Sequence, residues 1–495
     1  MAPDSHKTTI MILKYFFAIA IVCGLVPQGF GQNSPPNNLT VSFKGQQLSM
    51  TEVLSHYLQI PSVSGNEKEA GQFLQQISKE NGLYITPMGQ ENGNFNFAAS
   101  IAPLSPELPN IIFLNHLDVV PAGDSAQWTH PPFSGKVLDG DIWGRGAFDN
   151  KGPAIMQLFS IIETARQFQG TQLPFNVTLL AVSCEETQCE GGIRYVLDNF
   201  LEQLNPTVVI GEGPPSIDQV LKSDPDQDLF GISVAHKRPL WLELELKVTT
   251  SGHGSVTPVE YANKEMVLAL DRLLKRKQKA IYTPVNVDLL KQLGQLEKGV
   301  NAFALKNPKF FKWAIIPKVR KQPEMFALFS NTVTLTRMDS HNDVINVIPS
   351  KITAHLDCRL MPGQTTSDFI KEVRQRLRND DIYVTVVHEA PAMTPSDDNH
   401  PFYQFLAGSL KAAYPDAEPI SIMQPNFNDL GQFRARGITA FASTPIRMDR
   451  EYLNSIHQFN ERIPVAALEE GEAVFRDFIL KCINSEPLPN DMVRK

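Results

Sequence analysis

Three short and strongly apolar segments constrain the fold of this chain more than any other feature: 111–114 (IIFL), 177–182 (VTLLAV) and 208–210 (VVI). Stretches with helical spacing, 153–168 and 191–204, separate them. Alternation of strands and helices is typical of α/β folds, and continuously apolar strands are typical of a parallel sheet with helices on both faces. The sequence therefore predicts an α/β domain with a mostly parallel sheet.

The hydrophobic pattern changes after about His236. Residues 240–248 (LWLELELKV) alternate apolar with polar or charged side chains, which indicates a strand with one face in water. Further strand and helix patterns follow, and the resulting order β-α-β-β-α-β is the ferredoxin-like pattern. The segments that give this order are 240–248, 264–275, 330–336, 352–360, 366–377 and 383–388.

These two patterns divide the chain into an interrupted catalytic domain and an inserted one. We expect the first part of the catalytic domain at 39–236 and its second part at 394–485. Between them, 237–393 is expected to form a ferredoxin-like α+β lid domain that also serves dimerisation. Within the lid, 276–325 lacks strand periodicity and is expected to be a mostly helical insertion.

The N-terminus has the pattern of an export signal. Lys7 and Lys14 precede an apolar run at 15–26, and small residues follow at Gly29 and Gly31. The run is shorter than the roughly 20 apolar residues that a membrane-spanning helix needs. We therefore expect residues 1–31 to be a cleaved signal peptide, and the protein to be secreted or periplasmic without a stable membrane span. An uncleaved anchor is the alternative.

Charge and cysteine content narrow the class of protein further. The net charge of -8 does not favour a nucleic-acid-binding protein, which usually carries a basic patch. Basic residues in 276–325 hint at an acidic or amphipathic ligand, but a solvated face is the expected interpretation. Only four of the five cysteines lie outside the signal, too few for a disulfide scaffold. Cys184 and Cys189 are close enough for a local bridge.

Chemistry-capable side chains follow the apolar strands, where open α/β sheets place their active sites. Each alone has a simpler explanation; Asp149, for example, lies in a segment rich in turn residues. Together they supply the imidazoles and carboxylates that zinc hydrolases use as ligands. They are His116 and Asp118 after 111–114, Asp149 in GRGAFDNKG, Glu185 and Glu186 after 177–182, Glu212 after 208–210, and His457 in SIHQFNE.

Two local pairs strengthen this interpretation. Asp118 could accept the proton of the far ring nitrogen of His116, as carboxylates behind a metal-bound histidine do. Glu185 and Glu186 directly follow an apolar strand, so they point to opposite sides. One of them can then bind a metal while the other performs a different task.

Three longer motifs resemble the zinc-dependent aminoacylase/carboxypeptidase family, peptidase family M20. They are HLDVVPAG, WTHPPFSGKVLDGDIWGRGAFDNKG and NVIPSKITAHLDCRLMPG. The resemblance extends from about Met50 to the C-terminal helix expected at 464–482, and it is greatest to the branch of carboxypeptidase S and secreted N-fatty-acyl-amino-acid hydrolases. It implies a catalytic α/β domain with a ferredoxin-like lid, and hydrolysis of a peptide or N-acyl-amino-acid amide bond.

The resemblance also implies a ligand set for two zinc ions per chain, with cobalt or manganese as alternative metals. His116 and Glu212 would hold one ion, Glu186 and His457 the other, and Asp149 would bridge them. Two such ions lower the pKa of a shared water and polarise the scissile carbonyl.

Further roles follow from the same resemblance. Asp118 would orient His116, and Glu185 would be the general base. His253 in TSGHGSVTP would stabilise the oxyanion, often from the partner subunit of a dimer, although a turn histidine is the simpler interpretation. Asn346 and Arg359 would bind substrate; Arg359 needs either a structural or a substrate carboxylate, and we favour the substrate.

Departures from the family pattern leave the substrate open. Cys184 stands where the family usually has Asp, Asn428-Asp429 replaces Gly-Thr-Asp, and Asn150 replaces a frequent Asp without an evident consequence. The oligomeric state is also open, because the insertion could block a homodimer through the lid. Two other functions remain in competition: a catalytically silent binding protein, and a hydrolase with Cys184 as nucleophile.

Overall fold

The computed structural model describes residues 39–89, 93–249 and 252–485. The expected signal peptide at 1–31 lies outside the described residues. Within them, no helix has both the length and the apolar character needed to cross a membrane.

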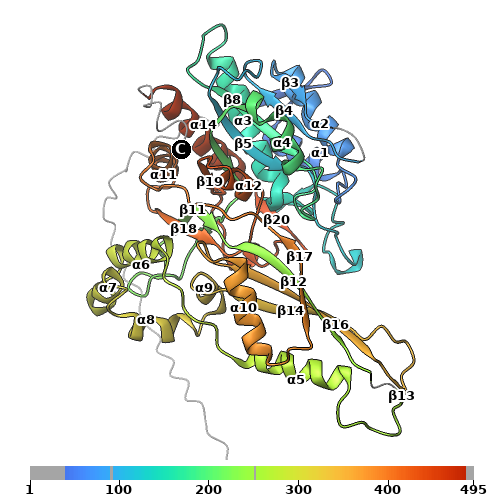
Figure 1. The fold of residues 1–495 in the computed structure, drawn as a ribbon. Helices are drawn as coiled ribbons and strands as arrows, with labels where there is room; N and C mark the ends of the chain where they lie inside the picture. Colours follow the sequence, from blue (N-terminus) through green and yellow to red (C-terminus); the bar gives the residue numbers. More distant parts are fainter. Residues whose placement is uncertain (1–38, 90–92, 250–251, 486–495) are drawn as a thin grey trace, which may run out of the picture. The chain divides into compact units, whose positions relative to one another are not determined.

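A large mixed sheet confirms the predicted α/β fold (Figure 1). Its central strands β19, β9, β5 and β8 run parallel to one another, and antiparallel strands flank them. The order is β10 (Ser216–Ile217), β11 (Leu229–His236), β19 (Ala440–Ala442), β9 (Pro206–Gly211), β5 (Asn110–His116), β8 (Asn176–Val182), β4 (Phe97–Ser100) and β3 (Tyr84–Pro87), with β18 (Glu418–Gln424) paired to β11.

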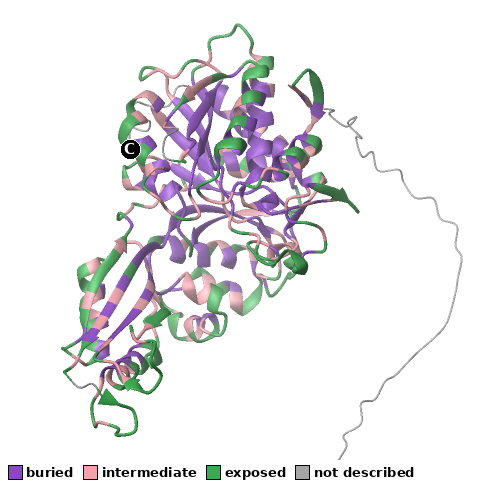
Figure 2. Ribbon diagram, turned by 90° about the vertical axis from the view of Figure 1, so that its right-hand side faces the viewer, coloured by how far each residue is buried: buried purple, intermediate pink, exposed green. Residues whose placement is uncertain are grey.

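Helices cover both faces of this sheet, which explains why its central strands are apolar throughout. Successive side chains of a strand point to opposite faces. Ile111 and Phe113 of β5 therefore pack into one core, and Ile112 and Leu114 into another. Figure 2 shows that the strands of the large sheet are mostly buried. The first core includes α1 (Met50–Leu58), α2 (Lys68–Glu80), α3 (Gly152–Gln167), α11 (Pro401–Ala413) and α14 (Ala466–Ile483); the second includes α4 (Ile193–Leu204) and α12 (Leu430–Ala435).

A second, four-stranded antiparallel sheet follows β11 directly. Its strand order is β14 (Thr332–Asp339), β16 (Lys351–Leu360), β12 (Arg238–Lys247) and β17 (Tyr383–Glu389), which is the ferredoxin-like order. The four leucines of β12 at even positions pack with α5 (Ala262–Lys275) and α10 (Thr366–Leu377). Trp241, Glu243 and Glu245 lie on the opposite face, as the alternating sequence predicted.

The segment 276–325 is helical as expected, but much of its packing is on the large sheet. Leu289 and Leu293 of α6 share a core with Ile420 and Ile422 of β18. Sequence periodicity identified the helices and could not show which sheet they cover. They are α6 (Pro284–Leu296), α7 (Gly299–Lys306), α8 (Lys312–Val319) and α9 (Pro323–Ala327).

A small three-stranded sheet joins two distant parts of the chain. β20 (Arg462–Pro464) pairs with β7 (Asp141–Trp143), which pairs with β6 (Lys136–Leu138). This pairing places the loop after α13 (Arg450–Leu453) beside the helical turn η2 (Ala147–Lys151). The remaining elements are the hairpin of β1 (Thr40–Phe43) and β2 (Gln46–Ser49), the paired β13 (Gly252–His253) and β15 (Val347–Ile348), and the turn η1 (Ser125–Gln127).

Candidate metal centre and active site

Asp149 lies between two histidines at the carboxyl ends of the central strands. Its Oδ1 is 3.0 Å from Nε2 of His116, which ends β5. Its Oδ2 is 3.0 Å from Nε2 of His457, from the loop before β20. Each carboxylate oxygen of Asp149 therefore faces a different imidazole.

One further glutamate lies beside each histidine. Glu212 Oε2, just after β9, is 3.1 Å from Nε2 of His116. Glu186 Oε1, after β8, is 3.2 Å from Nε2 of His457. The structure thus forms two groups, each with a histidine and a glutamate, that share Asp149.

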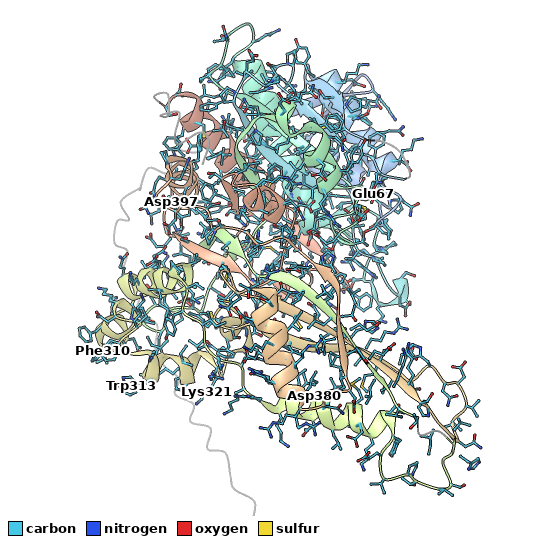
Figure 3. All side chains as sticks on the ribbon, in the orientation of Figure 1. Glu67, Phe310, Trp313, Lys321, Asp380 and Asp397 are labelled. Atoms are coloured by element: carbon cyan, nitrogen blue, oxygen red, sulfur yellow. A yellow bond between two sulfur atoms is a disulfide. The ribbon has the colours of Figure 1, made fainter. Side chains whose placement is uncertain are left out.

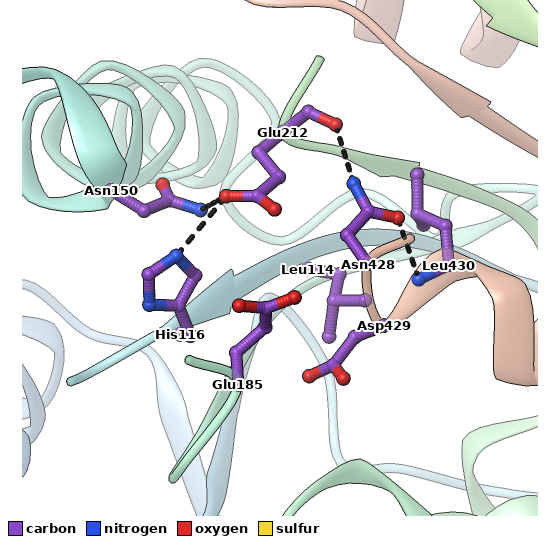
Figure 4. Close-up of a pocket in the computed structure, with 8 residues that line it drawn as sticks. All are labelled: Leu114, His116, Asn150, Glu185, Glu212, Asn428, Asp429 and Leu430. Atoms are coloured by element: carbon purple, nitrogen blue, oxygen red, sulfur yellow. Dashed lines mark hydrogen bonds and ion pairs between the residues drawn. The ribbon is translucent and has the colours of Figure 1, made fainter. Parts of the chain in front are cut away.

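The Glu185 side chain faces the His116 group. It lines a pocket together with His116, Glu212 and Asp429 (Figure 4). Its Oε1 accepts a hydrogen bond from Nε2 of Gln188 at 3.1 Å. The adjacent residues Glu185 and Glu186 therefore contact different neighbours, as the sequence pattern indicated.

Asp118 connects His116 to the glutamate pair. We expected its carboxylate to contact the His116 ring, but its backbone oxygen lies closer to that ring. The His116 Nδ1 lies 2.9 Å from the backbone carbonyl oxygen of Asp118 and 3.4 Å from its Oδ1. The carboxylate instead accepts the backbone N–H groups of Glu185 at 3.0 Å and Glu186 at 3.2 Å, and the hydroxyl of Ser64 at 2.7 Å. One residue therefore positions an imidazole and both glutamates.

Glu461 holds the backbone on which Asp149 lies, and the sequence analysis did not identify it. Its Oε1 accepts the N–H groups of Phe148 at 3.0 Å and Asp149 at 3.2 Å. Its Oε2 pairs with Arg145 at 2.6 Å, and both side chains are buried. Glu461 lies in the quoted SIHQFNE motif, but only the fold brings it to residues 145–149.

Two asparagines hold Glu212. Asn150 Nδ2 donates to Glu212 Oε2 at 3.2 Å, so Asn150, which was expected to have no evident consequence, has a structural role. Asn428 Nδ2 donates to the backbone oxygen of Glu212 at 3.0 Å. Asp429 follows and is buried in the same pocket.

The electrostatics of the site favour bound cations. Burial and the charges of Glu212 and Asp429 raise the pKa of Glu185 well above its usual range. Burial raises the pKa of Asp429 to about 8. Hydrogen bonds to Asp149 and Glu186 raise the pKa of His457 to about 10. Crowded carboxylates disfavour each other's charge, and positive charge among them relieves this repulsion.

The donor atoms also fit a metal centre. Ligand atoms of His116, Glu185 and Glu212 all lie within 4.8 Å of one another, and so do those of His116, Asp149 and Glu186. Imidazole nitrogens and carboxylate oxygens are the ligands that catalytic zinc prefers.

A disulfide closes the loop that carries the glutamate pair. Cys184 and Cys189 are bonded, with their Cα atoms 5.7 Å apart. Glu185 and Glu186 lie inside this short loop. A bridged Cys184 has no thiolate, so this structure does not support its proposed role as a nucleophile.

The candidate residues His253, Asn346 and Arg359 lie apart from this cluster. His253 and Asn346 are together at the pair of short strands β13 and β15, with His253 Nε2 3.1 Å from Asn346 Nδ2. Arg359 lies near the other end of β16 and makes a two-bond pair with Asp357, at 2.8 and 2.9 Å. The substrate carboxylate expected for Arg359 stays a prediction; in the structure its guanidinium pairs with Asp357. Arg359 and Asp357 are two residues apart in β16 and lie on the same partly exposed face of the strand, so Asp357 is within reach as the partner.

Comparisons with known proteins agree with this fold. A sequence profile described as Peptidase family M20/M25/M40 matches residues 112–481. N-fatty-acyl-amino acid synthase/hydrolase PM20D1 of Bos taurus is 26% identical over 458 residues, covering 88% of each chain. Probable carboxypeptidase S-like 2 of Dictyostelium discoideum is 23% identical and covers 75% of this chain and 71% of its own. The M20 metallo-carboxypeptidase Sso-CP2 of Sulfolobus solfataricus has a TM-score of 0.66 at 20% identity, covering 87% of this chain and 98% of its own.

The fold, the site and the profile match define a hydrolase that acts on carbon–nitrogen bonds. The chain belongs to peptidase family M20/M25/M40. The resemblance inferred from the sequence motifs is therefore confirmed, and so is the branch, because its relatives include the fatty-acyl amino acid hydrolases and a carboxypeptidase S-like protein.

We predict that Glu461→Gln strongly destabilises the protein. The substitution leaves the buried guanidinium of Arg145 without its carboxylate, a change that costs about 3–5 kcal/mol. Glu451→Gln is the matched control, because the Glu451 side chain is exposed and its buried partner Arg462 keeps a second carboxylate, that of Asp141. An ion pair whose carboxylate stays in solvent contributes about 0–1 kcal/mol. Thermal unfolding should show a much larger fall in Tm for Glu461→Gln; equal falls would contradict the assigned role of Glu461.

We predict that Cys184→Ser and Cys189→Ser lower the rate of hydrolysis equally. Either substitution opens the same bridge and loosens the same loop. A nucleophilic Cys184 would give a different result, because only Cys184→Ser would then abolish turnover. Initial rates of the two variants, measured side by side, distinguish these outcomes.

Proposed function

We propose that this chain is a secreted two-zinc hydrolase of peptide or N-acyl-amino-acid amide bonds. The observation that carries the proposal is Asp149, whose two carboxylate oxygens face His116 and His457 separately. A shared carboxylate between two histidine–glutamate groups is suited to two cations rather than one.

Each metal would have its own ligands. His116 and Glu212 would hold one ion, Glu186 and His457 would hold the other, and Asp149 would be a ligand shared by both. Bound ions of this kind would supply Lewis-acid polarisation of the scissile carbonyl and would lower the pKa of a water molecule. Zinc suits this nitrogen and oxygen donor set, and cobalt or manganese is the alternative.

Glu185 would move the proton. Water adds to the carbonyl carbon while a Glu185 carboxylate oxygen accepts its proton, and the same oxygen then donates that proton to the leaving amine nitrogen. The C–N bond breaks, and the products are a carboxylic acid and an amine. Asp118 supports this step as a positioning residue, since its carboxylate holds the backbone N–H of Glu185.

His253 would stabilise the oxyanion. Its Nδ1 lies 2.8 Å from the Ser255 hydroxyl, and its Nε2 lies 3.1 Å from the Asn346 amide nitrogen. The ring is exposed, so Nε2 would contact substrate once the Asn346 amide moves. Asn346 and Arg359 would bind substrate, with Asp357 holding the guanidinium until a substrate carboxylate arrives.

A second copy of the chain would bring His253 to the site. β12 has ten residues and separates β13 from β11, a length of roughly 30 Å. Figure 1 shows β13 beyond the far end of that strand, away from β5 and β8. A homodimer through the lid, 237–393, would therefore supply His253 to the catalytic domain formed by 39–236 and 394–485.

The names of the relatives guide the choice of substrate and location. One is named as acting on N-fatty-acyl amino acids and another as carboxypeptidase S-like, so the proposed substrates are an N-acyl amino acid or a peptide. The disulfide next to the glutamate pair supports an oxidising compartment and hence the proposed secretion.

Glu185→Gln tests whether Glu185 carries the proton while the adjacent Glu186 binds metal. We expect turnover to fall by about 10²–10⁴-fold with metal content unchanged, because only the proton carrier is lost. Glu186→Gln is the matched variant and should lose metal as well as turnover. Metal loss in Glu185→Gln would show that Glu185 is a ligand, and unchanged turnover would remove it from the mechanism. Rates on dipeptides and N-acyl amino acids, with metal analysis of the same samples, give both readouts.

Mixing two inactive variants tests whether His253 acts across a dimer. His253→Asn retains Glu185, and Glu185→Gln retains His253. In a two-fold dimer, half of the mixed molecules are heterodimers with one complete site each, so activity should recover to about a quarter of wild type. No recovery after subunit exchange would show that His253 acts within its own chain or takes no part.

A further inference from the structure

Helices α7 and α8 carry a group of apolar side chains that project into solvent. Val300 is 85% exposed, Phe303 61%, Phe310 75% and Trp313 71%. Figure 3 labels Phe310 and Trp313 at the outer edge of these helices. Single exposed apolar residues are ordinary, but a contiguous set marks a surface that contacts another apolar phase.

Ring contacts join two of these side chains, Phe303 and Phe310, through Phe311. The ring centroids of Phe303 and Phe311 are 5.4 Å apart, and those of Phe310 and Phe311 are 4.9 Å apart. Ile315 and Val319 of α8 face inward and form a small core with Leu290. The helices therefore already have a buried face, and the aromatic side chains are additional to it.

Lysines surround the same patch without acidic partners. The stretch 298–323 contains seven basic residues and no Asp or Glu, although the whole chain has a net charge of -8. Among the ion pairs of the described residues, none involves the six exposed lysines of this stretch. They are Lys298, Lys306, Lys309, Lys312, Lys318 and Lys321.

We propose that the α7–α8 knob (Val300, Phe303, Phe310, Trp313 and those six lysines) binds an anionic lipid surface. Aromatic side chains suit the boundary between headgroups and acyl chains, and lysines around them contact acidic headgroups. A nucleic acid would complement the lysines but would offer no apolar phase to valine and phenylalanine. The sequence alone favoured a solvated basic face for this segment, and the exposed aromatic residues change that interpretation.

Flotation with vesicles of phosphatidylcholine, with and without phosphatidylserine, tests the proposal on the full chain. We expect binding to the phosphatidylserine vesicles, little to pure phosphatidylcholine, and weakening by salt. Phe310→Ser/Trp313→Ser and Lys306→Glu/Lys309→Glu/Lys312→Glu should each reduce partitioning by about tenfold or more. All five side chains are exposed, so Tm and hydrolysis of a soluble substrate should stay unchanged.

Matched variants elsewhere on the surface complete the test. Lys68→Glu/Lys79→Glu/Lys371→Glu makes the same change of charge at exposed lysines, and Val256→Ser/Val259→Ser removes exposed apolar groups from the lid. Both should bind as wild type does. Absence of wild-type binding, equal binding to both lipid mixtures, or undiminished binding by the knob variants would overturn the proposal. None of these outcomes depends on the hydrolytic function.

Discussion

The carboxylate of Asp149 holds together two histidines from distant parts of the chain. His116 ends a central strand, whereas His457 comes from a loop near the C-terminus. Pairing of β20 with β7 brings that loop to Asp149, and Glu461 of the same loop binds the backbone of Asp149 directly. The site therefore forms only when the first and last parts of the catalytic domain have both folded.

This arrangement concentrates negative charge in a buried place. Carboxylates of Glu185, Glu212 and Asp429 lie around one pocket, and burial with mutual repulsion raises the pKa values of all three. A fold retains such a cluster when a cation compensates it. The carboxylates of Asp118 and Glu461 accept the backbone N–H groups of Glu185 and Phe148 and so hold the loops that carry the ligands, and the metals would enter a site that the polypeptide has already arranged.

Local patterns predicted the strands and their polar ends, because apolar runs and alternation follow directly from burial. Ile111 to Leu114 and the alternating Leu240 to Leu246 are examples, and both lie in strands as expected. Partners set by long-range folding could not be predicted. Glu461 contacts residues more than 300 positions earlier, and no local pattern indicates that contact. Exposure of Phe310 and Trp313 also depends on which side of a helix the core occupies.

Metal stoichiometry of the purified protein tests the bridging role of Asp149 most directly. The account predicts about two zinc ions per wild-type chain. It also predicts that Asp149→Asn loses metal from both positions, while Asp139→Asn, at an exposed turn, retains both ions. A wild-type chain with one ion, or an Asp149→Asn chain that keeps two, would contradict it.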